Sequence, residues 1–301
     1  DAWVVHPRPI ARSVEDLDLL MGCFARKPLE TGEPTPHLNW PSFREVDTNT
    51  LRVGLYVDNG FFTPSSSIRR VVEEAGRALV GRGLEVVPFE IPGGTEPIEL
   101  AYQLLGAAGK GWLDRALDGD KPTVTIKSLQ QTMGLPNVAR GLLVALLDLA
   151  GQNLSAELLR ACRPTDAAAF WELTAKRSAY RARFLEAMDD AGLDLLLCPT
   201  YGLPAPHLDS NATGVVSIAG TYSIVFNLLG MPAGSVPFGR VHDDEQKGRP
   251  TSRDQVLQAA RSIEEGSAGM PLGVQVVGRH WREDQVLAVM KLLEEQAPSL
   301  L

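Results

Sequence analysis

The chain has 301 residues, of which 44% are hydrophobic and 22% are charged, and its formal net charge is −8 at pH 7. This composition is typical of a soluble globular protein, and the length allows a sizeable core in one large or two small domains. The acidic balance, without clusters of Lys and Arg, excludes a nucleic-acid-binding surface.

Targeting and redox signals are weak. Residues 1–12 carry charges and prolines where a signal peptide would have an apolar core. No run of about 20 apolar residues predicts a transmembrane span. The three cysteines, Cys23, Cys162 and Cys198, are widely spaced and odd in number, which indicates reduced thiols. We therefore expect a cytoplasmic protein.

The first predicted element is a helix that Ser13 caps, with an apolar face expected to belong to the core. Residues 27–50 hold four prolines and are interpreted as a surface excursion. A strand over 51–57, a helix that opens at Ser65, Ser66 and Ser67, and a strand over 84–89 then form a βαβ-like unit. This order predicts the α/β class.

Residues 96–191 are predicted to be mostly helical, with one helix over 99–117 and a long one over 165–191 that Gly192 ends. Between them, residues 136–150 are strongly apolar, with only Arg140 and Asp148 charged. This helix is too short to span a bilayer, so it is either a buried core helix or one that lies in a membrane interface.

A buried strand over 193–197 follows and ends at Cys198. That cysteine, or Ser217, with His207 as a base, would suit a free-standing hydrolase, although an ordinary strand end explains the pattern better. The serines at 65–67 are interpreted as helix caps for the same reason.

Two Gly-Met-Pro triplets organise the rest of the chain. Each is predicted to form a turn that feeds a short strand, over 234–236 and 274–277. The charged segment 240–268 between them is interpreted as a surface insertion. An amphipathic helix over 283–296 completes the chain.

These triplets stand in phrases that resemble the C-terminal half of amidase-signature hydrolases. Residues 227–232 match an Asn-x-x-Gly-x-Pro turn, and residues 269–275 match a Gly-x-Pro-x-Gly-x-Gln strand. The segment 9–17, Pro-Ile-Ala-Arg-Ser-Val-Glu-Asp-Leu, is similar to the family's Pro-Met-Ala-Arg segment. Within the family the chain is most similar to fatty acid amide hydrolases, through residues 135–143, residues 212–217 and Trp281 with the acidic pair after it.

The resemblance implies a single amidase-signature domain over 1–301, with a mixed sheet covered by helices. It implies hydrolysis of hydrophobic, fatty-acid-type amides by a serine nucleophile, a bridging serine and a neutral lysine, without a cofactor or metal. In the family these residues precede the segment that matches 9–12, and no Gly-Gly-Ser-Ser run occurs here. We therefore assign no catalytic residue to this chain, and expect the later, inactive part of a longer protein.

By position in the resemblance, the substrate-binding residues are Val216 and Ile224 along an acyl channel, Leu142 and Leu146 at its membrane-facing mouth, and Trp281 near its floor. Each is equally credible as a core residue. The expected partners are a small amide substrate, a membrane surface that residues 137–150 would contact, and a second copy of the chain in a homodimer. The alternative is a non-catalytic, membrane-associating or partner-binding remnant of such an enzyme.

Overall fold

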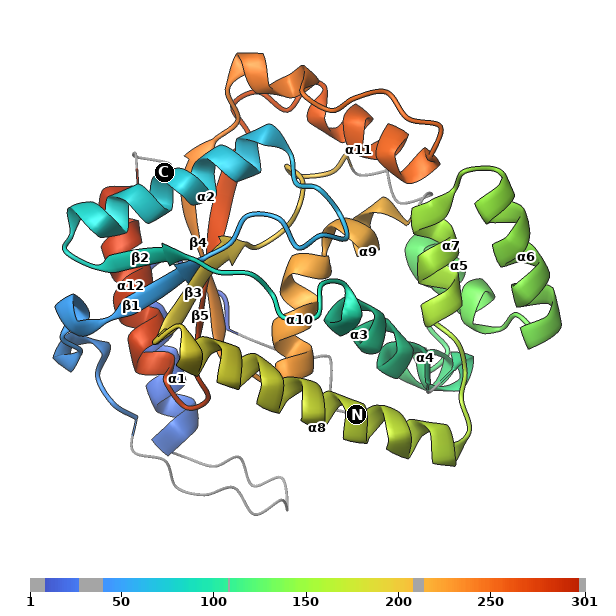
Figure 1. Cartoon of the computed structure of the whole chain (residues 1–301), viewed down its shortest axis with the longest axis horizontal. Helices are drawn as coiled ribbons and strands as arrows, with labels where there is room; N and C mark the ends of the chain where they lie inside the picture. The colour runs from blue at the N-terminus through green and yellow to red at the C-terminus, as the bar shows by residue number, and fades with distance from the viewer. Residues whose placement is uncertain (1–8, 27–39, 108, 208–213, 298–301) are drawn as a thin grey trace.

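The computed structural model describes residues 9–26, 40–107, 109–207 and 214–297, and it is built around one five-stranded sheet (Figure 1). The strands are β1 (Arg52–Leu55), β2 (Glu85–Pro88), β3 (Leu195–Pro199), β4 (Ala233–Arg240) and β5 (Pro271–Gly278). Their order across the sheet is β2-β1-β3-β5-β4. β1 is parallel to β2 and β3, whereas β5 is antiparallel to both of its neighbours. The predicted α/β class with a mixed sheet is confirmed.

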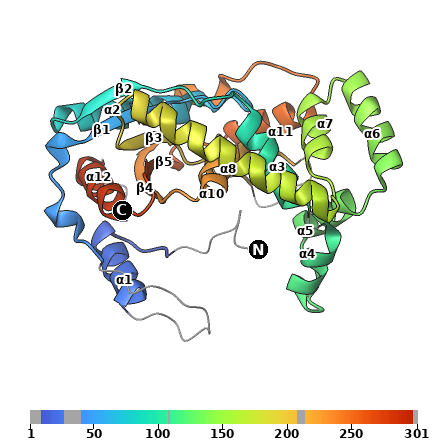
Figure 2. The same cartoon turned by 60° about the horizontal axis from the view of Figure 1, so that its bottom comes forward.

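Helices cover both faces of this sheet (Figures 1 and 2). α2 (Ser66–Gly81) and α12 (Glu283–Gln296) pack on one face, against a core that contains Leu195 and Leu197. α3 (Glu96–Ala107), α8 (Ala167–Asp190) and α10 (Thr221–Leu229) form the other layer, whose core contains Leu196 and Cys198. Successive side chains of a strand point to opposite faces, so burial on both faces explains why β3 is a continuous apolar run.

The βαβ-like unit is confirmed, including its capping. The Ser65 Oγ accepts a hydrogen bond from the Ile68 amide at 3.3 Å and lies 2.9 Å from the Ser67 Oγ. Ser65 is therefore the N-cap of α2, whereas Ser66 and Ser67, predicted as caps with it, lie inside the first turn of the helix. Gly76 allows α2 to lie close to the sheet, because a Cβ there would meet the Leu55 side chain.

The remaining helices lie around this layered core. They are α1 (Val14–Arg26), α4 (Lys110–Leu117), α5 (Val124–Met133), α6 (Asn137–Leu149), α7 (Asn153–Ala161), α9 (Val215–Ala219) and α11 (Gln255–Glu264). Figures 1 and 2 show α4 to α7 grouped at one end of the molecule, away from the sheet. Short 3₁₀ turns occur at 43–45, 48–50 and 243–247.

Three sequence predictions about the helices are wrong. The helix predicted over 99–117 is two helices, α3 and α4, because Gly109 between them adopts φ +62°. The apolar face of α1 is core only in part, since Val14 is buried and Leu17 packs against the core, whereas Leu19 and Phe24 are 69% and 53% exposed. The segment 240–268 is not merely a surface insertion, because α11 contributes Val256, Ala260 and Ile263 to the core that also contains Leu196 and Cys198.

The sides of α8 also differ from the prediction. Trp171, expected on the apolar side, is exposed, whereas Arg177, expected on the polar side, is buried. The Arg177 Nε donates a hydrogen bond to the Leu228 carbonyl at the end of α10. A guanidinium can satisfy the carbonyls that a helix leaves unpaired at its C-terminus. In contrast, both predicted C-terminal strands and the helix over 283–296 are confirmed.

Candidate substrate-binding site

Two of the five predicted substrate-binding residues lie close together in the layer that α3, α8 and α10 form on one face of the sheet. Val216 on α9 and Ile224 on α10 are half-buried and pack against the core beside Tyr201. A tight turn at Gly220 joins the two helices, with its amide donating to the carbonyls of α9. The structure therefore places both residues at one edge of the core, partly accessible from outside.

Two tyrosines hold α9 in place. The Tyr102 hydroxyl donates to the Ser217 carbonyl at 2.7 Å, and the Tyr201 hydroxyl donates to the Val216 carbonyl at 3.1 Å. Burial raises the pKa of Tyr201 to about 12 and that of Tyr102 further. Both hydroxyls therefore remain protonated donors at neutral pH, and they fix the backbone on which Val216 stands.

Leu142 and Leu146 lie on α6, which exposes apolar side chains and buries a charged one, the reverse of a core helix. Leu142 and Leu146 are 66% and 54% exposed, and Val138 and Leu149 extend the same exposed apolar stripe. The one buried residue on α6 is Arg140. Its guanidinium donates to the carbonyls of Thr132, Leu159 and Cys162 near the ends of α5 and α7. α6 thus buries a charged side chain, while Leu142 and Leu146 face outward.

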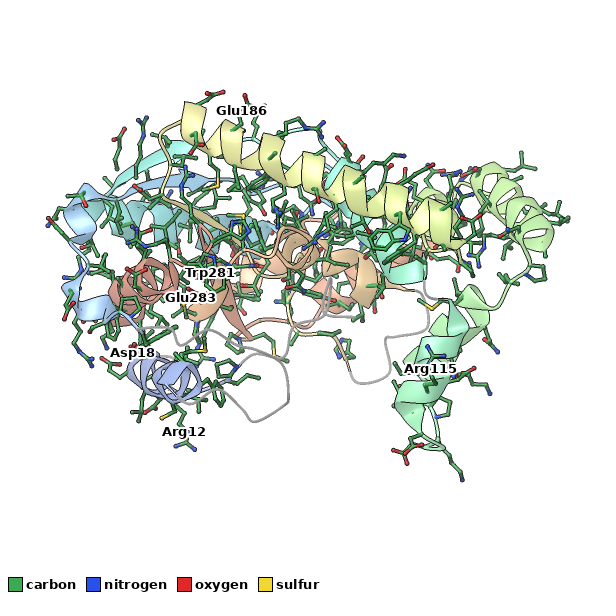
Figure 3. All side chains as sticks on the ribbon, turned by 90° about the horizontal axis from the view of Figure 1, so that it is seen from below. Arg12, Asp18, Arg115, Glu186, Trp281 and Glu283 are labelled. Atoms are coloured by element: carbon green, nitrogen blue, oxygen red, sulfur yellow. The ribbon has the colours of Figure 1, made fainter. Side chains whose placement is uncertain are left out.

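Trp281 lies in the connection between β5 and α12, and Figure 3 shows it near Glu283 at the start of α12. It is 70% exposed and adopts φ +65°, a conformation that is rare for a bulky residue. The neighbouring His280 Nε2 lies 2.9 Å from the Leu229 carbonyl, which ties this connection to the end of α10. Residues held in rare backbone conformations cluster at functional sites.

The described residues do not bring all five predicted side chains into one pocket. α6 stands at the outer end of the molecule, remote from the sheet to which the Trp281 connection belongs (Figures 1 and 3). A hollow of about 590 Å³ is lined by α5 and the residues around it, and one of about 340 Å³ lies between residues 41–51 and the start of α12. Neither hollow contains any of the five residues.

A comparison with known protein families identifies the family of this chain. A sequence model of the family described as Amidase matches residues 5–287. The chain belongs to the amidase family. The predicted resemblance to amidase-signature hydrolases is confirmed.

Individual amidase relatives give the same picture. The chain is 29% identical to fatty-acid amide hydrolase 1 of Sus scrofa over 95% of its own length and 50% of the relative's length. It is 29% identical to fatty acid amide hydrolase 1 of Caenorhabditis elegans over 86% of its length and 45% of the relative's. A solved fatty acid amide hydrolase superposes with a TM-score of 0.67 at 22% identity, covering 96% of this chain and 47% of that chain. The chain thus spans about half the length of these relatives.

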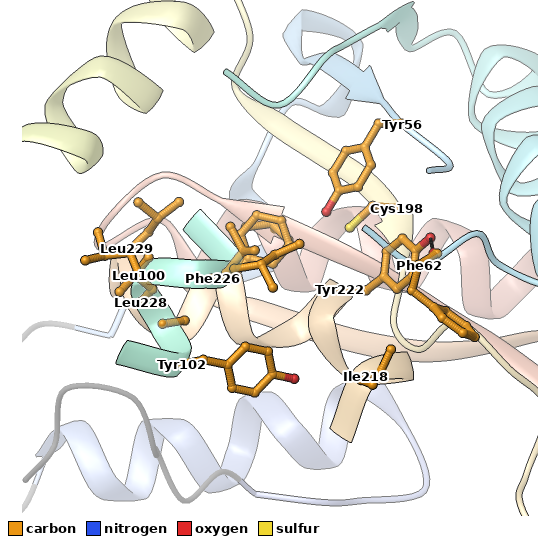
Figure 4. Packing of buried hydrophobic residues seen from close by; sticks show 14 of the residues in the cluster. Tyr56, Phe62, Leu100, Tyr102, Cys198, Ile218, Tyr222, Phe226, Leu228 and Leu229 are labelled. Atoms are coloured by element: carbon orange, nitrogen blue, oxygen red, sulfur yellow. Dashed lines mark hydrogen bonds between the residues drawn. The ribbon is translucent and has the colours of Figure 1, made fainter. Parts of the chain in front are cut away.

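Within this amidase chain, the cysteine proposed as a nucleophile is unsuited to that role. Cys198 is fully buried, and the Tyr56 hydroxyl points toward its sulfur (Figure 4). Burial raises the pKa of the Cys198 thiol to about 12, so the reactive thiolate is scarcely populated at neutral pH. Ser217 is exposed, and Asp209, two residues after His207, lies outside the described residues.

Two findings bear on cofactors and membranes. Among the described residues, no three His, Cys, Asp or Glu side chains gather in a way that could hold a metal ion. In the same part of the chain, no helix combines the length and the apolar character needed to cross a membrane.

Proposed function

We propose that this chain is part of a hydrolase that cleaves hydrophobic carboxamides, with fatty acid amides as the substrate class. The observation that carries the proposal is the 29% identity to a fatty-acid amide hydrolase that extends over 95% of the chain. In this proposal the serine nucleophile, the bridging serine and the neutral lysine lie in a segment that precedes residue 1.

The substrate's acyl chain would lie along the accessible edge of the layer that α3, α8 and α10 form. Val216 and Ile224 suit this role because they are apolar, half-buried and supported by the core behind them. Trp281 offers a large apolar surface that the described structure leaves uncovered. Leu142 and Leu146 on α6 would lie at the point where an apolar substrate enters from a membrane. Apolar side chains are the usual lining of sites for such ligands.

The chain alone is proposed to be inactive. Amide hydrolysis needs a nucleophile, a base that takes its proton and donors for the tetrahedral oxyanion. Removal of a single oxyanion donor lowers kcat by about 10²–10³, so the joint loss of nucleophile, base and donors would leave no measurable turnover. Cys198, the buried thiol, does not replace them.

The test compares two proteins, the 301-residue chain and the same chain preceded by its natural upstream sequence. We expect only the extended protein to hydrolyse carboxamides, and to prefer a long-chain over a short-chain amide. Substitution of Leu142 and Leu146 by Ala is expected to reduce turnover of the long-chain amide selectively. Turnover by the 301-residue chain that is lost on Ser217→Ala or Cys198→Ala would instead assign the chemistry to this chain.

A second candidate is a non-catalytic module that associates with membranes, and the reversed polarity of α6 favours it. An exposed stripe of Val138, Leu142, Leu146 and Leu149 is suited to lie in a membrane interface. The coding sequence that precedes residue 1 separates the candidates: a Lys and a Gly-Ser-Ser run there support the hydrolase, whereas a start codon near residue 1 supports the module. The expected homodimer stays a prediction.

A further inference from the structure

A row of side chains that carry polar atoms crosses the sheet on the face that α10 covers. Gln275 on β5 pairs with Cys198 on β3 and with Ser235 on β4, and residues paired in this way point to the same face. Tyr56 extends the row, because its amide donates to Leu197 and its hydroxyl points toward Cys198 (Figure 4). The row runs from the buried core at Tyr56 to the exposed Ser235.

Gln275 has an unused acceptor within this row. Its side chain is only 4% exposed, and its buried Oε1 accepts no hydrogen bond from any described residue. An unsatisfied buried acceptor costs about 1–3 kcal/mol and is rare in folded proteins. The Oε1 therefore suits a donor that comes from outside the described fold.

The exposed end of the row is an uncharged hydroxyl pair. The Thr200 Oγ1 and the Ser235 Oγ lie 2.8 Å apart. Thr200 directly follows β3 and Ser235 lies on β4, the two strands that flank β5. Gly273 on β5 leaves room for this contact, since a Cβ there would lie 3.3 Å from the Ser235 Oγ. The Ser223 Oγ donates to the Thr200 carbonyl at 2.5 Å and joins α10 to the pair.

The chemistry of the cluster selects for a neutral ligand group. In the described part of the chain, the hydrogen bonds of Thr200, Ser223 and Ser235 go to hydroxyl and carbonyl oxygens and not to charged side chains. A carboxamide offers an N–H donor and a carbonyl acceptor, which match the Gln275 Oε1 and the hydroxyls. A carboxylate offers acceptors only, and it would be desolvated beside that oxygen without a cation to pair with it.

We propose that Thr200, Ser235 and Gln275 form a subsite for a neutral carboxamide group. The ligand's N–H donates to the Gln275 Oε1 and its carbonyl accepts from one of the two hydroxyls. Because the Oε1 is covered and the hydroxyl pair is exposed, the ligand separates the two hydroxyls and replaces their mutual bond. The inference rests on the proposed function and deepens it, since such a subsite holds an amide substrate and releases the carboxylate product.

The test measures binding of octanamide and octanoate to the protein by isothermal titration calorimetry. These probes share one alkyl chain and differ in the head group alone. The wild type is expected to bind octanamide more tightly. Gln275→Met keeps the volume and removes the acceptor, and it is expected to weaken octanamide binding on the order of 5- to 10-fold without changing octanoate binding. Gln131→Met, at an exposed glutamine on α5, is the matched control and should change neither.

Thr200→Val and Ser235→Ala give an independent readout if Gln275→Met fails to fold, because each should also reduce the preference for octanamide. The proposal is overturned if the wild type binds octanoate as tightly as octanamide. It is also overturned if folded variants keep the wild-type preference. Gln275-dependent octanamide binding together with no amide turnover by the chain extended with its natural upstream sequence would reject the hydrolase and keep the subsite. Amide turnover by the extended protein with Gln275-independent binding would reject the subsite alone.

Discussion

The outward-facing leucines of α6 allow a quantitative test of the membrane-facing role. In the double variant Leu142→Glu with Leu146→Glu, two side chains that are 66% and 54% exposed become charged. Full burial of a leucine contributes roughly 1.5–3 kcal/mol. The fraction already buried in the fold is about a third for one leucine and a half for the other, so we expect a loss of roughly 1–2.5 kcal/mol in folding stability.

The same arithmetic predicts a larger effect on membrane binding. The exposed fractions together amount to slightly more than one leucine, so their transfer to lipid contributes roughly 2–3.5 kcal/mol. Loss of this transfer weakens vesicle binding by about 30- to 300-fold. Flotation with phosphatidylcholine vesicles measures this change without an electrostatic contribution, and thermal unfolding measures the stability of the same samples.

Two matched variants make the result interpretable. Val80→Glu alters a side chain that is 55% exposed on α2, outside the stripe, and should leave flotation unchanged. Leu159→Glu on α7 alters a side chain that is 6% exposed and should unfold the helices around it. If the double variant unfolds as Leu159→Glu does, α6 is a core helix. If it floats as the wild type does, the stripe does not contact the membrane.

Three further predictions concern single contacts. Arg140→Met removes the donors to the carbonyls near the ends of α5 and α7. Hydrogen exchange should therefore accelerate in both helices by an amount that corresponds to roughly 1–3 kcal/mol. Unchanged protection would show that the guanidinium is dispensable. Cys23 is exposed, while burial raises the pKa of Cys198 to about 12, so a thiol reagent at pH 8 should label Cys23 quickly and Cys198 only after unfolding. Equal labelling rates would contradict the buried position. The Lys291 Nζ lies 2.7 Å from Glu15 and lowers the pKa of that carboxyl. The contact should therefore stabilise α1 above the ordinary glutamate pKa of about 4.3, and this stability should be lost as the pH falls through the lower pKa of the folded protein. Hydrogen exchange in α1 should accelerate over that pH range in the wild type. An equal acceleration in Glu15→Gln would refute this.

Much of the sheet and its neighbours could be predicted from the sequence alone. The strand before Cys198 and the helix over 283–296 have local signatures, namely a continuous apolar run and a regular apolar period. The capping role of Ser65 follows from its place before a helical pattern. Membership of the amidase family could likewise be predicted, because it rests on short motifs whose order can be read along the chain.

Tertiary structure decided which surface each pattern faces. Periodicity reports that a helix has an apolar side, but not whether another element covers that side. The exposed Leu19 and Phe24 of α1 and the buried face of α11 were therefore both mispredicted. Arg140 and Arg177 are buried because carbonyls distant in the sequence accept their hydrogen bonds, and no local pattern encodes such partners. The unpaired Gln275 Oε1 depends in the same way on strands that meet only in the folded sheet.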